Sequence, residues 1–498
     1  MSDVPPPTGP DVPEQMRIRR EKRAELLASG VPPYRLGFDR THTFVGLRSA
    51  YPDLAPGTET GDRAAVAGRV IFLRNTGKLC FARLREGDGA ELQVMLSLDR
   101  VGEESLAQWK HLVDIGDHVG VEGEVIVSKR GELSVTADTW IMLSKALRPL
   151  PVAHKDLNEE TRVRQRYADL IVNPAAREMV RTRATVTRSV RETLHRHGYI
   201  EVETPVLQLI HGGAAARPFH THLNAFDIPM TLRIALELYL KRAIVGGVDK
   251  VYEIGRIFRN EGIDSTHSPE FTMLEAYGAY EDYDGMAALT RDIVVDAARA
   301  IGRTVIFDGH GGEIDLEAPW QRVTLHEAVS NAVGDEVTID TPVQRLRDLA
   351  DKHQVRLDPE WDHGEIVLEL FEKLAEHTFM PPTFICDYPE SVRPLARPHR
   401  GDPRLVEAWD LIVGGVECGV AYSELIDPVL QRERLATQSL KAAAGDPEAM
   451  QLDEDFLRAI EYGMPPTGGM GLGIDRLLML LTGVGIRETI LFPLVKPE

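Results

Sequence analysis

The segment FRNEGIDSTHSPEFTMLE, residues 258–275, carries an arginine near one end and a phenylalanine and a glutamate near the other. Turn-forming residues and one histidine, His267, lie between them. If the two arms pair as antiparallel strands, Arg259, Phe271 and Glu275 can face one pocket, whereas in a simple surface hairpin they would not meet. The segment therefore predicts either a surface hairpin or a site whose ligand contacts a guanidinium, an aromatic face and a carboxylate together.

A glycine-rich segment near the end of the sequence, GMGLGID at residues 469–475, is a second candidate for binding. It superficially matches a dinucleotide-binding loop, but only about 25 residues follow it, too few for a βαβ unit with a later acidic partner. We therefore expect a strand packed closely against a neighbour, then a helix over residues 475–481 with Asp475 as its N-cap. Arg476 would lie at the positive end of that helix, where an anionic ligand explains a cation better than bare solvent does.

Composition limits the class of protein. The 498 residues, 43% hydrophobic and 27% charged, predict two or three soluble globular domains. No apolar run approaches the roughly 20 residues of a membrane span, the N-terminus does not read as a signal peptide, and three widely spaced cysteines favour the cytoplasm. The formal net charge of -20 argues against general affinity for nucleic acid, so any such contact must be local. One basic cluster, residues 16–23, begins an expected helix that ends at Gly30, and it is either a solvated face or a contact with a polyanion.

The texture of the sequence changes along the chain. Short strands between residues 66 and 146, interrupted by a helix-like segment near 103–112, predict a small barrel of the oligonucleotide-binding (OB) kind. After Asn173, strands and helices alternate without regular βαβ spacing, which favours an α+β domain around an antiparallel sheet. The expected organisation is an N-terminal extension with a basic helix (1–65), an OB-fold barrel (66–147), a linker (148–175) and an α+β domain (176–498).

Three motifs together resemble the class II lysyl-tRNA synthetases. YIEVETPVL (199–207) is similar to motif 1 of that family, FRNEGIDSTHSPEFTMLEAY (258–277) to motif 2, and GLGIDRLLML (471–480) to motif 3. GGAAARPF (212–219) is typical of the lysine enzymes, and the resemblance extends over the chain from about residue 14. It implies a class II antiparallel-sheet catalytic domain after an N-terminal OB-fold β-barrel, and a homodimer formed through the motif 1 helix and Pro205.

The resemblance implies that the motif 2 hairpin binds ATP. Arg259 would grip the α-phosphate and the amino-acid carboxylate, and with Arg476 it would be the catalytic residue pair. Phe271 would stack under adenine while Arg476 covers the other face of the ring. Glu261 and His267 would lie near the adenine edge and the terminal phosphates. Without the resemblance, core packing is the simpler reading of Phe271.

Ligands for metal and amino acid are also implied by the resemblance. Asp410 and Glu417 in AWDLIVGGVECG would hold Mg²⁺ on the phosphates, although the family usually has glutamate where Asp410 stands. Glu424, helped by Tyr277, would pair with the ε-ammonium of lysine, because a buried ammonium needs a counter-ion. Gly213 and Glu237 would hold the α-ammonium, and Tyr422 would lie beside the aliphatic stem of lysine. Arg259 and Glu275 are the remaining lysine-binding residues that the resemblance implies.

Two residues beside the expected lysine pocket depart from the family pattern. Val420 replaces an asparagine of the family's GNGFSEL segment, and Leu236 replaces the proline of APELYLK. The combination resembles an actinobacterial-type subgroup, which includes the synthetase-like part of proteins that lysylate membrane lipid. We expect lysine to bind more weakly here, with Arg259 contributing more to binding of its carboxylate.

The resemblance also implies that the barrel reads the anticodon of tRNA-Lys. Phe81 and Gln93 lie on expected strands, where an aromatic ring can stack a splayed base and an amide can read its edge. Arg74 and Glu132 match further anticodon-binding positions of the family. The alternative for Phe81 is a place in the barrel core.

The expected function is that of a cytoplasmic lysine–tRNA ligase, which converts L-lysine and ATP to lysyl-adenylate and then charges tRNA-Lys. The retained site residues disfavour a non-catalytic tRNA-binding paralogue, and the barrel disfavours a relative that lysylates protein. A lipid-lysylating fusion would need a membrane domain, which these residues do not contain. A second-copy synthetase that supplies lysyl-tRNA for lipid lysylation stays open as an alternative.

Overall fold

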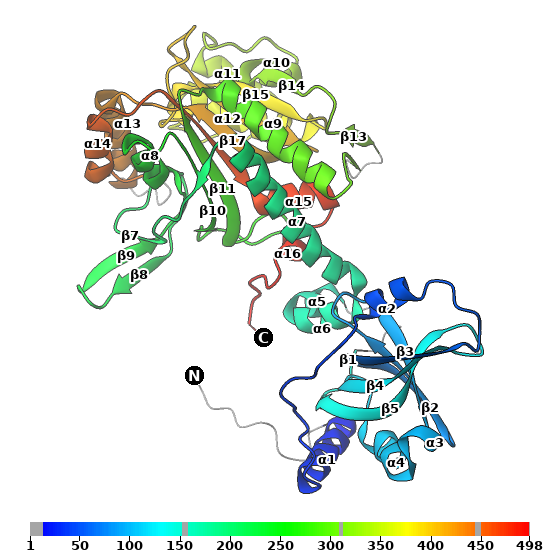
Figure 1. Cartoon of the computed structure of the whole chain (residues 1–498). Coiled ribbons are helices and arrows are strands. Elements are labelled where there is room, and N and C mark those ends of the chain that lie inside the picture. The colour runs from blue at the N-terminus through cyan, green and yellow to red at the C-terminus, as the bar shows by residue number, and fades with distance from the viewer. Residues whose placement is uncertain (1–12, 152–157, 308–311, 444–449, 498) are drawn as a thin grey trace. The chain divides into compact units, whose positions relative to one another are not determined.

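The computed structural model describes residues 13–151, 158–307, 312–443 and 450–497 (Figure 1). Contacts divide the chain into two compact units, residues 1–177 and 178–498. The first unit contains a barrel and short helices, and the second is built around one large sheet.

Five strands of the first unit close into a barrel in the order β1-β2-β3-β5-β4, which is the OB-fold arrangement expected from the sequence. Alternating residues of β2 and β3 point inward, so that Cys80, Ala82 and Leu84 are buried while Phe81 is only half-buried. The strands are β1 (Glu59–Thr76), β2 (Leu79–Arg85), β3 (Glu91–Ser97), β4 (His118–Val127) and β5 (Leu133–Ser144).

Helices accompany the barrel within the first unit. Helix α4 spans Glu103–Leu112, where the sequence predicted the interruption, and the basic helix α1 spans Glu14–Ala28 before Gly30, which has a positive φ of 75°. Part of the basic cluster serves the fold: Arg19 is buried and donates to two backbone carbonyls, and Lys22 pairs with Asp114 at 2.6 Å. The other helices that begin in this unit are α2 (Phe44–Ala50), α3 (Leu98–Val101), α5 (Glu159–Arg164), α6 (Arg166–Val172) and α7 (Pro174–Arg196).

The second unit contains an eight-stranded sheet in the order β14-β15-β16-β17-β18-β11-β10-β6. Its pairs are antiparallel except for the outermost ones, β14 with β15 and β10 with β6, which are parallel. This confirms the α+β class with a largely antiparallel sheet. The strands are β6 (Ile200–Glu201), β10 (Lys250–Phe258), β11 (Glu270–Ala279), β14 (Gln321–Thr324), β15 (Thr383–Pro389), β16 (Leu405–Val413), β17 (Val416–Ser423) and β18 (Thr467–Gly473).

Helices pack on the sheet and divide its residues into two faces. Leu274 and Ala276 of β11 join a buried cluster with α7, α9 (Tyr283–Ala300) and α15 (Ile474–Thr482), the helices drawn alongside the sheet in Figure 1. Phe271 and Tyr277 alternate to the opposite face, where they pack with α8 (Glu237–Val245) and α14 (Glu454–Glu461). The remaining elements are β7 (Leu207–Gln208), β8 (His220–Leu223), β9 (Ile228–Leu232), β12 (Val305–Phe307), β13 (Glu313–Asp315), α10 (Leu325–Val333), α11 (Val343–Lys352), α12 (His363–Leu374), α13 (Pro428–Ala443), α16 (Ile486–Thr489) and two 3-10 turns, η1 (Glu376–Thr378) and η2 (Glu390–Val392).

Two local expectations differ from the structure. The expected strand YIEVETP reduces to the two residues of β6, and Ile200 is exposed because β6 lies at the edge of the sheet. The prediction that Asp475 is an N-cap is wrong, because α15 begins at Ile474 with Gly473 as its N-cap. The carboxylate of Asp475 instead accepts from the backbone N–H of Thr272 at 2.7 Å and from Arg183 at 2.5 Å.

Candidate active site

The motif at residues 258–275 forms an antiparallel hairpin, in which β10 pairs with β11. The ladder continues past the strand end, because the Arg259 N–H donates to Pro269 O at 2.9 Å. The Arg259 guanidinium carbon lies 5.4 Å from the centre of the Phe271 ring, and Glu275 lies on the same face of β11 as Phe271. The two arms therefore bring the arginine, the aromatic ring and the carboxylate to one face of the sheet.

Alternate glycines of β18 leave room on this face. Gly473, Gly471 and Gly469 pair directly with Met273, Glu275 and Tyr277 of β11. The sequence predicted that these glycines allow a close approach to a neighbouring strand. The structure shows in addition that the three glycines lie on the face that carries the site. A Cβ on Gly469 would lie 2.0 Å from Glu424 Oε1 and 2.4 Å from the Tyr277 ring, whereas a Cβ on Gly471 would have no neighbour closer than 3.7 Å.

This difference gives a matched pair of substitutions. Gly469→Ala should reduce kcat/KM for the amino-acid substrate by about a hundredfold, because Glu424 and Tyr277 must shift to admit the methyl group. Gly471→Ala, two residues along the same strand, should retain activity within about threefold, since its methyl group would make ordinary contacts. Steady-state amino-acid activation by both variants checks this, and equal losses would contradict it.

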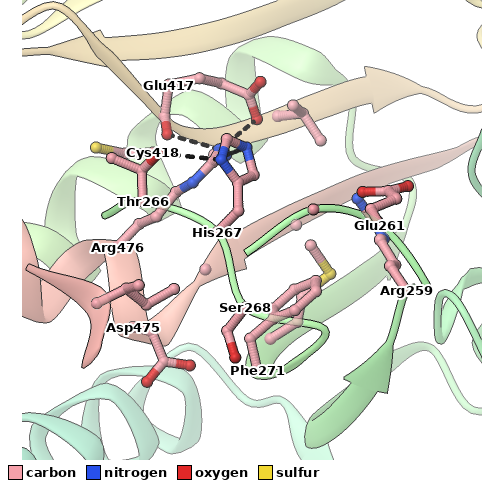
Figure 2. A pocket seen from close by; sticks show the side chains of 17 residues that line it. Arg259, Glu261, Thr266, His267, Ser268, Phe271, Glu417, Cys418, Asp475 and Arg476 are labelled. Carbon is pink, nitrogen blue, oxygen red and sulfur yellow. Dashed lines mark hydrogen bonds and ion pairs between the residues drawn. The ribbon is translucent and has the colours of Figure 1, made fainter. Parts of the chain in front are cut away.

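One end of the site is a pocket formed by the hairpin, β17, β18 and α15 (Figure 2). Arg259 and Glu261 lie on one side of it, and Arg476, His267 and Glu417 lie together on the other. Arg476 donates to Glu417 O at 2.9 Å and approaches Glu417 Oε1 at 3.4 Å, while its other terminal nitrogen lies 3.5 Å from His267 Nε2. All five expected ATP-binding residues line the pocket: Arg259, Glu261, His267, Phe271 and Arg476.

The electrostatics of this pocket suit an anion. Burial lowers the pKa of Arg259, although Glu261, Glu275 and Glu417 oppose the shift. Arg476 is in the first turn of α15, where the backbone dipole adds positive potential. Two guanidinium groups at one pocket stabilise a phosphate ester better than they stabilise an apolar ligand.

The other end of the same face carries three buried carboxylates: Glu237, Glu275 and Glu424. The Tyr277 hydroxyl donates to Glu275 Oε2 at 3.0 Å, and the Leu236 N–H donates to Glu275 Oε1 at 2.9 Å. Burial and the nearby Glu237 raise the pKa of Glu275 to about 7, and burial also raises the pKa of Glu424. The hydroxyl of Tyr277 thus contacts Glu275, and its expected role beside Glu424 in pairing with the lysine ammonium stays a prediction.

The remaining residues of the expected lysine site lie around these carboxylates. Gly213 has a positive φ of 86°, and a Cβ there would lie 3.0 Å from Glu237 Cβ. Tyr422 is half-buried and pairs with Gly469 in the ladder between β17 and β18. Val420 of β17 pairs with Asp410 of β16 on one side and with Gly471 of β18 on the other, and Gly471 pairs in turn with Glu275 of β11. Val420 and Glu275 therefore lie in one row across the sheet. Leu236, which replaces the family's proline, changes the hydrogen bonding of the site. Its backbone N–H donates to Glu275, and a proline has no N–H to donate.

The two expected metal ligands, Asp410 and Glu417, differ in burial and in hydrogen bonding. Asp410 is buried, and its Oδ2 accepts from the Tyr388 hydroxyl at 2.7 Å and from Arg393 at 2.6 Å. Its Oδ1 has no hydrogen-bond partner among the described residues. Glu417 is half-buried at the edge of the pocket, and its charge contributes to the raised pKa of Asp410. Within the described part of the chain, no group of three or more acidic, histidine or cysteine side chains could hold a metal alone.

Sequence reasoning missed several residues next to the site. Lys241 pairs with Glu237 and Glu424, Arg393 pairs with Asp410, and Glu376 has a pKa raised to about 7 by burial and by the charge of Glu417. Arg393 and Glu376 come from segments distant in sequence from the motifs. Lys241 lies only four residues after Glu237, and this spacing on one helix was the available signal, but it depends on knowing that this face of α8 turns toward the site.

The barrel carries its expected residues on the outside, within the first unit. Arg74 pairs with Phe81 across β1 and β2, and Gln93 pairs with Ser134 across β3 and β5. Gln93 Nε2 donates to Ser134 Oγ at 2.8 Å, and Ser134 Oγ donates to the carbonyl of Glu132 at 2.9 Å. The half-buried outer position of Phe81 excludes the barrel core. Phe72 and Arg83 also lie on this outer face, where they pair across β1 and β2. The sequence analysis did not name them, although their alternation with buried residues predicts an outward position.

Comparison with protein-family models agrees with both units. The antiparallel sheet, the hairpin, the glycine-rich strand and the arginine in the helix after it are the features that the resemblance to class II synthetases implied. The model described as tRNA synthetases class II (D, K and N) matches residues 158–496, and the chain belongs to this family. The model described as OB-fold nucleic acid binding domain matches residues 64–143.

Individual relatives are similar over the whole chain. A lysine–tRNA ligase from Mycolicibacterium gilvum is 58% identical over 494 residues, which cover 99% of each chain. Lysine–tRNA ligase 1 from Mycobacterium tuberculosis (strain ATCC 25618 / H37Rv) is 55% identical over 498 residues, again 99% of each chain. A bifunctional lysylphosphatidylglycerol biosynthesis protein from Nocardia farcinica is 48% identical over 497 residues, but these make up only 43% of that protein. In the described residues, no helix is both long and apolar enough to cross a membrane.

Proposed function

We propose that this chain is a lysine–tRNA ligase that activates L-lysine with ATP and transfers it to tRNA-Lys. The observation that carries the proposal is that the two ends of the site lie on one face of β11. Phe271 of this face lines the pocket that contains the two arginines, and Glu275 of the same face belongs to the group of buried carboxylates. Glu424 Oε1 has no hydrogen-bond partner among the described residues, so an ammonium group from a ligand would satisfy it.

In this proposal Arg259 and Arg476 are the catalytic residues of adenylate formation. Arg259, between the two ends of the site, holds the α-phosphate and the lysine carboxylate together. Phe271 and Arg476 enclose adenine, and Glu261 and His267 contact the adenine edge and the terminal phosphates. No general base is needed in this step, because the lysine carboxylate is already ionised, so positioning and charge stabilisation lower the barrier.

Mg²⁺ fits the proposed site as a partner of ATP. Asp410 Oδ1 is a buried carboxylate oxygen without a hydrogen-bond partner in the described chain, and Glu417 supplies a second carboxylate at the pocket edge. Mg²⁺ prefers such oxygens and commonly takes its other ligands from phosphate and water. When bound, it would neutralise phosphate charge. Arg393 would keep Asp410 oriented through Oδ2.

The amino-acid end then accounts for selectivity. Glu424 pairs with the ε-ammonium, Glu237 and the backbone at Gly213 hold the α-ammonium, and Tyr422 lies along the stem. Glu275 and Tyr277 form a hydrogen-bonded pair between these positions.

Val420 gives a test of the expected weak binding of lysine. Val420→Asn should lower KM for lysine by about threefold to tenfold, because an amide in this row can donate to the substrate carboxylate, for about 1 kcal/mol. Kinetics of ATP–pyrophosphate exchange with varied lysine measure this. An unchanged KM would show that Arg259 alone suffices for the carboxylate and that Val420 does not weaken binding.

Binding of lysine should depend on pH. Glu424 must be ionised to pair with the ε-ammonium, and the charge of the neighbouring Glu275 adds to the attraction; both acids have raised pKa values, about 7 for Glu275. Because each carboxylate loses its proton as the pH rises, KM for lysine should fall by about tenfold from pH 6.5 to pH 8.5. KM for ATP should change by less than threefold over the same range. A lysine KM that is flat across this range would contradict the proposed roles of these acids.

We also propose that the outer face of the barrel binds the anticodon through Arg74, Phe81, Gln93 and Glu132. Charging of a tRNA-Lys transcript with radiolabelled lysine tests the function as a whole. Phe81→Ala should raise KM for tRNA by about tenfold, as expected for one lost base stack, while leaving lysine-dependent ATP–pyrophosphate exchange unchanged. Failure to charge tRNA-Lys, with exchange intact, would overturn the transfer step of the proposal.

Homodimerisation and a cytoplasmic location complete the proposal. Apolar side chains are exposed around motif 1 and the sheet of β7, β8 and β9, which supports a contact between subunits; they are Ile200, Val206, Leu207, Leu209 and Phe226. Light scattering coupled to size exclusion should give about twice the chain mass of 55.4 kDa. A monomer at micromolar concentration would contradict this part of the proposal.

A further inference from the structure

Lys241 lies inside the amino-acid end of the site, between two of its carboxylates. Its side chain is fully buried, and Nζ lies 2.6 Å from Glu237 Oε1 and 2.5 Å from Glu424 Oε2. Lys241 and Glu237 are four residues apart on α8 and therefore share a face of the helix. Glu424 follows β17, so a single ammonium group links a helix on one side of the site to a strand end on the other.

We infer that Lys241 is a positioning residue of the amino-acid site. It holds one oxygen of Glu237 and one of Glu424, and so orients their other oxygens toward the two ammonium groups of the substrate. This inference rests on the proposed lysine–tRNA ligase function and deepens it. It adds a residue that acts through both acids and that the sequence motifs did not single out.

The free oxygens of the two acids support this role. Glu424 Oε1 faces β18 at the point where Gly469 has no side chain. Glu237 Oε2 lies 3.7 Å from the position that a Cβ of Gly213 would occupy. Lys241 pairs with neither of these oxygens, and each of them lies close to a glycine at the amino-acid end of the site. Glu424 Oε1 has no hydrogen-bond partner among the described residues, so an ammonium group of the substrate can pair with it.

The charge balance of the site points the same way. Three buried carboxylates in one region would repel each other and take up protons if no cation were present. Lys241 opposes the effect of burial on the pKa of Glu424, and a protonated Glu424 could not form an ion pair with an ammonium group. The ionisable groups that face these acids are Lys241 and Glu237 from α8, Glu275 and Tyr277 from β11, Tyr422 of β17, Glu424 after β17, and Arg259 from the hairpin.

The test compares three variants of Lys241 in the full-length protein by ATP–pyrophosphate exchange. Lys241→Met removes the charge at similar length, Lys241→Gln removes the charge but keeps N–H donors, and Lys241→Arg keeps the charge. In the Met and Gln variants KM for lysine should rise by roughly thirtyfold or more while KM for ATP stays within about twofold, and Lys241→Arg should recover most of the loss. The fall of lysine KM with rising pH should also move to higher pH in the two neutral variants, because their carboxylates ionise later.

Lys250 provides a matched control in the same unit, since it begins β10 and pairs with Glu281, which is not one of these carboxylates. Lys250→Met should leave both KM values unchanged. Wild-type protein that shows no lysine-dependent exchange would refute the proposed function itself. Wild-type exchange with an unchanged lysine KM in Lys241→Met, or an equal loss in all three Lys241 variants, would overturn the positioning role specifically.

Discussion

Glu424→Gln should lower kcat/KM for lysine by about a thousandfold or more in ATP–pyrophosphate exchange, with KM for ATP unchanged within about twofold. The carboxylate is almost completely buried, and its Oε1 has no partner in the described structure until a ligand supplies one. Glutamine keeps the shape and still offers an oxygen to Lys241, but it removes the charge that compensates a buried ammonium. The loss should therefore fall on lysine and not on the nucleotide.

The matched control for this substitution is Glu454→Gln. Glu454 belongs to the same unit and is also ion-paired, but its partner is Arg432 and both side chains are exposed. An exposed pair of this kind contributes little, so the control should be indistinguishable from wild type. If Glu424→Gln instead kept lysine activation and lost affinity for ATP, the assignment of the carboxylate end to lysine would be wrong.

Arg259→Lys should lower kcat by about a hundredfold to a thousandfold, the loss observed when one stabilising donor is removed from a transition state. The substitution keeps the positive charge but loses the planar pair of N–H donors that can bridge a phosphate and a carboxylate. Arg259 also contacts the Phe271 ring and donates from Nε to Ile234 O at 3.3 Å, and lysine would lose the latter contact. Rapid-quench measurement of adenylate formation would isolate the affected step.

Arg256→Lys is the corresponding control on the same hairpin. Arg256 lies three residues earlier on β10, is exposed, and approaches Glu270 at 3.7 Å. Its replacement should leave kcat within about twofold of wild type. Equal effects at positions 256 and 259 would indicate damage to the hairpin and would contradict a direct role for Arg259 in the chemistry.

The hairpin was predictable because its information is local. Alternation along β11 places Phe271 and Glu275 on one face, and the turn between the arms sets the register with β10. The barrel followed from strand lengths and turn residues in the same way. The resemblance to class II synthetases then supplied roles for Arg476 and Glu424 that neither alternation nor spacing could give.

What the sequence did not reveal depends on distant partners. Asp475 has the residue type of an N-cap, but the helix begins one residue earlier and its carboxylate is used by Arg183 of α7. Lys241 has the spacing of an ordinary i,i+4 pair with Glu237, and only the packing of α8 against β10 and β11 brings it to Glu424. The hydrogen bond from Tyr277 to Glu275 was likewise not predicted, because the orientation of a hydroxyl is set by tertiary geometry.

ATP–pyrophosphate exchange, measured separately with each of the twenty amino acids, tests the central claim most directly. The account predicts exchange with lysine alone, because only lysine places an ammonium group at Glu424 while its carboxylate reaches Arg259. Exchange with a different amino acid, or with none, would contradict the claim that this pocket selects and activates lysine.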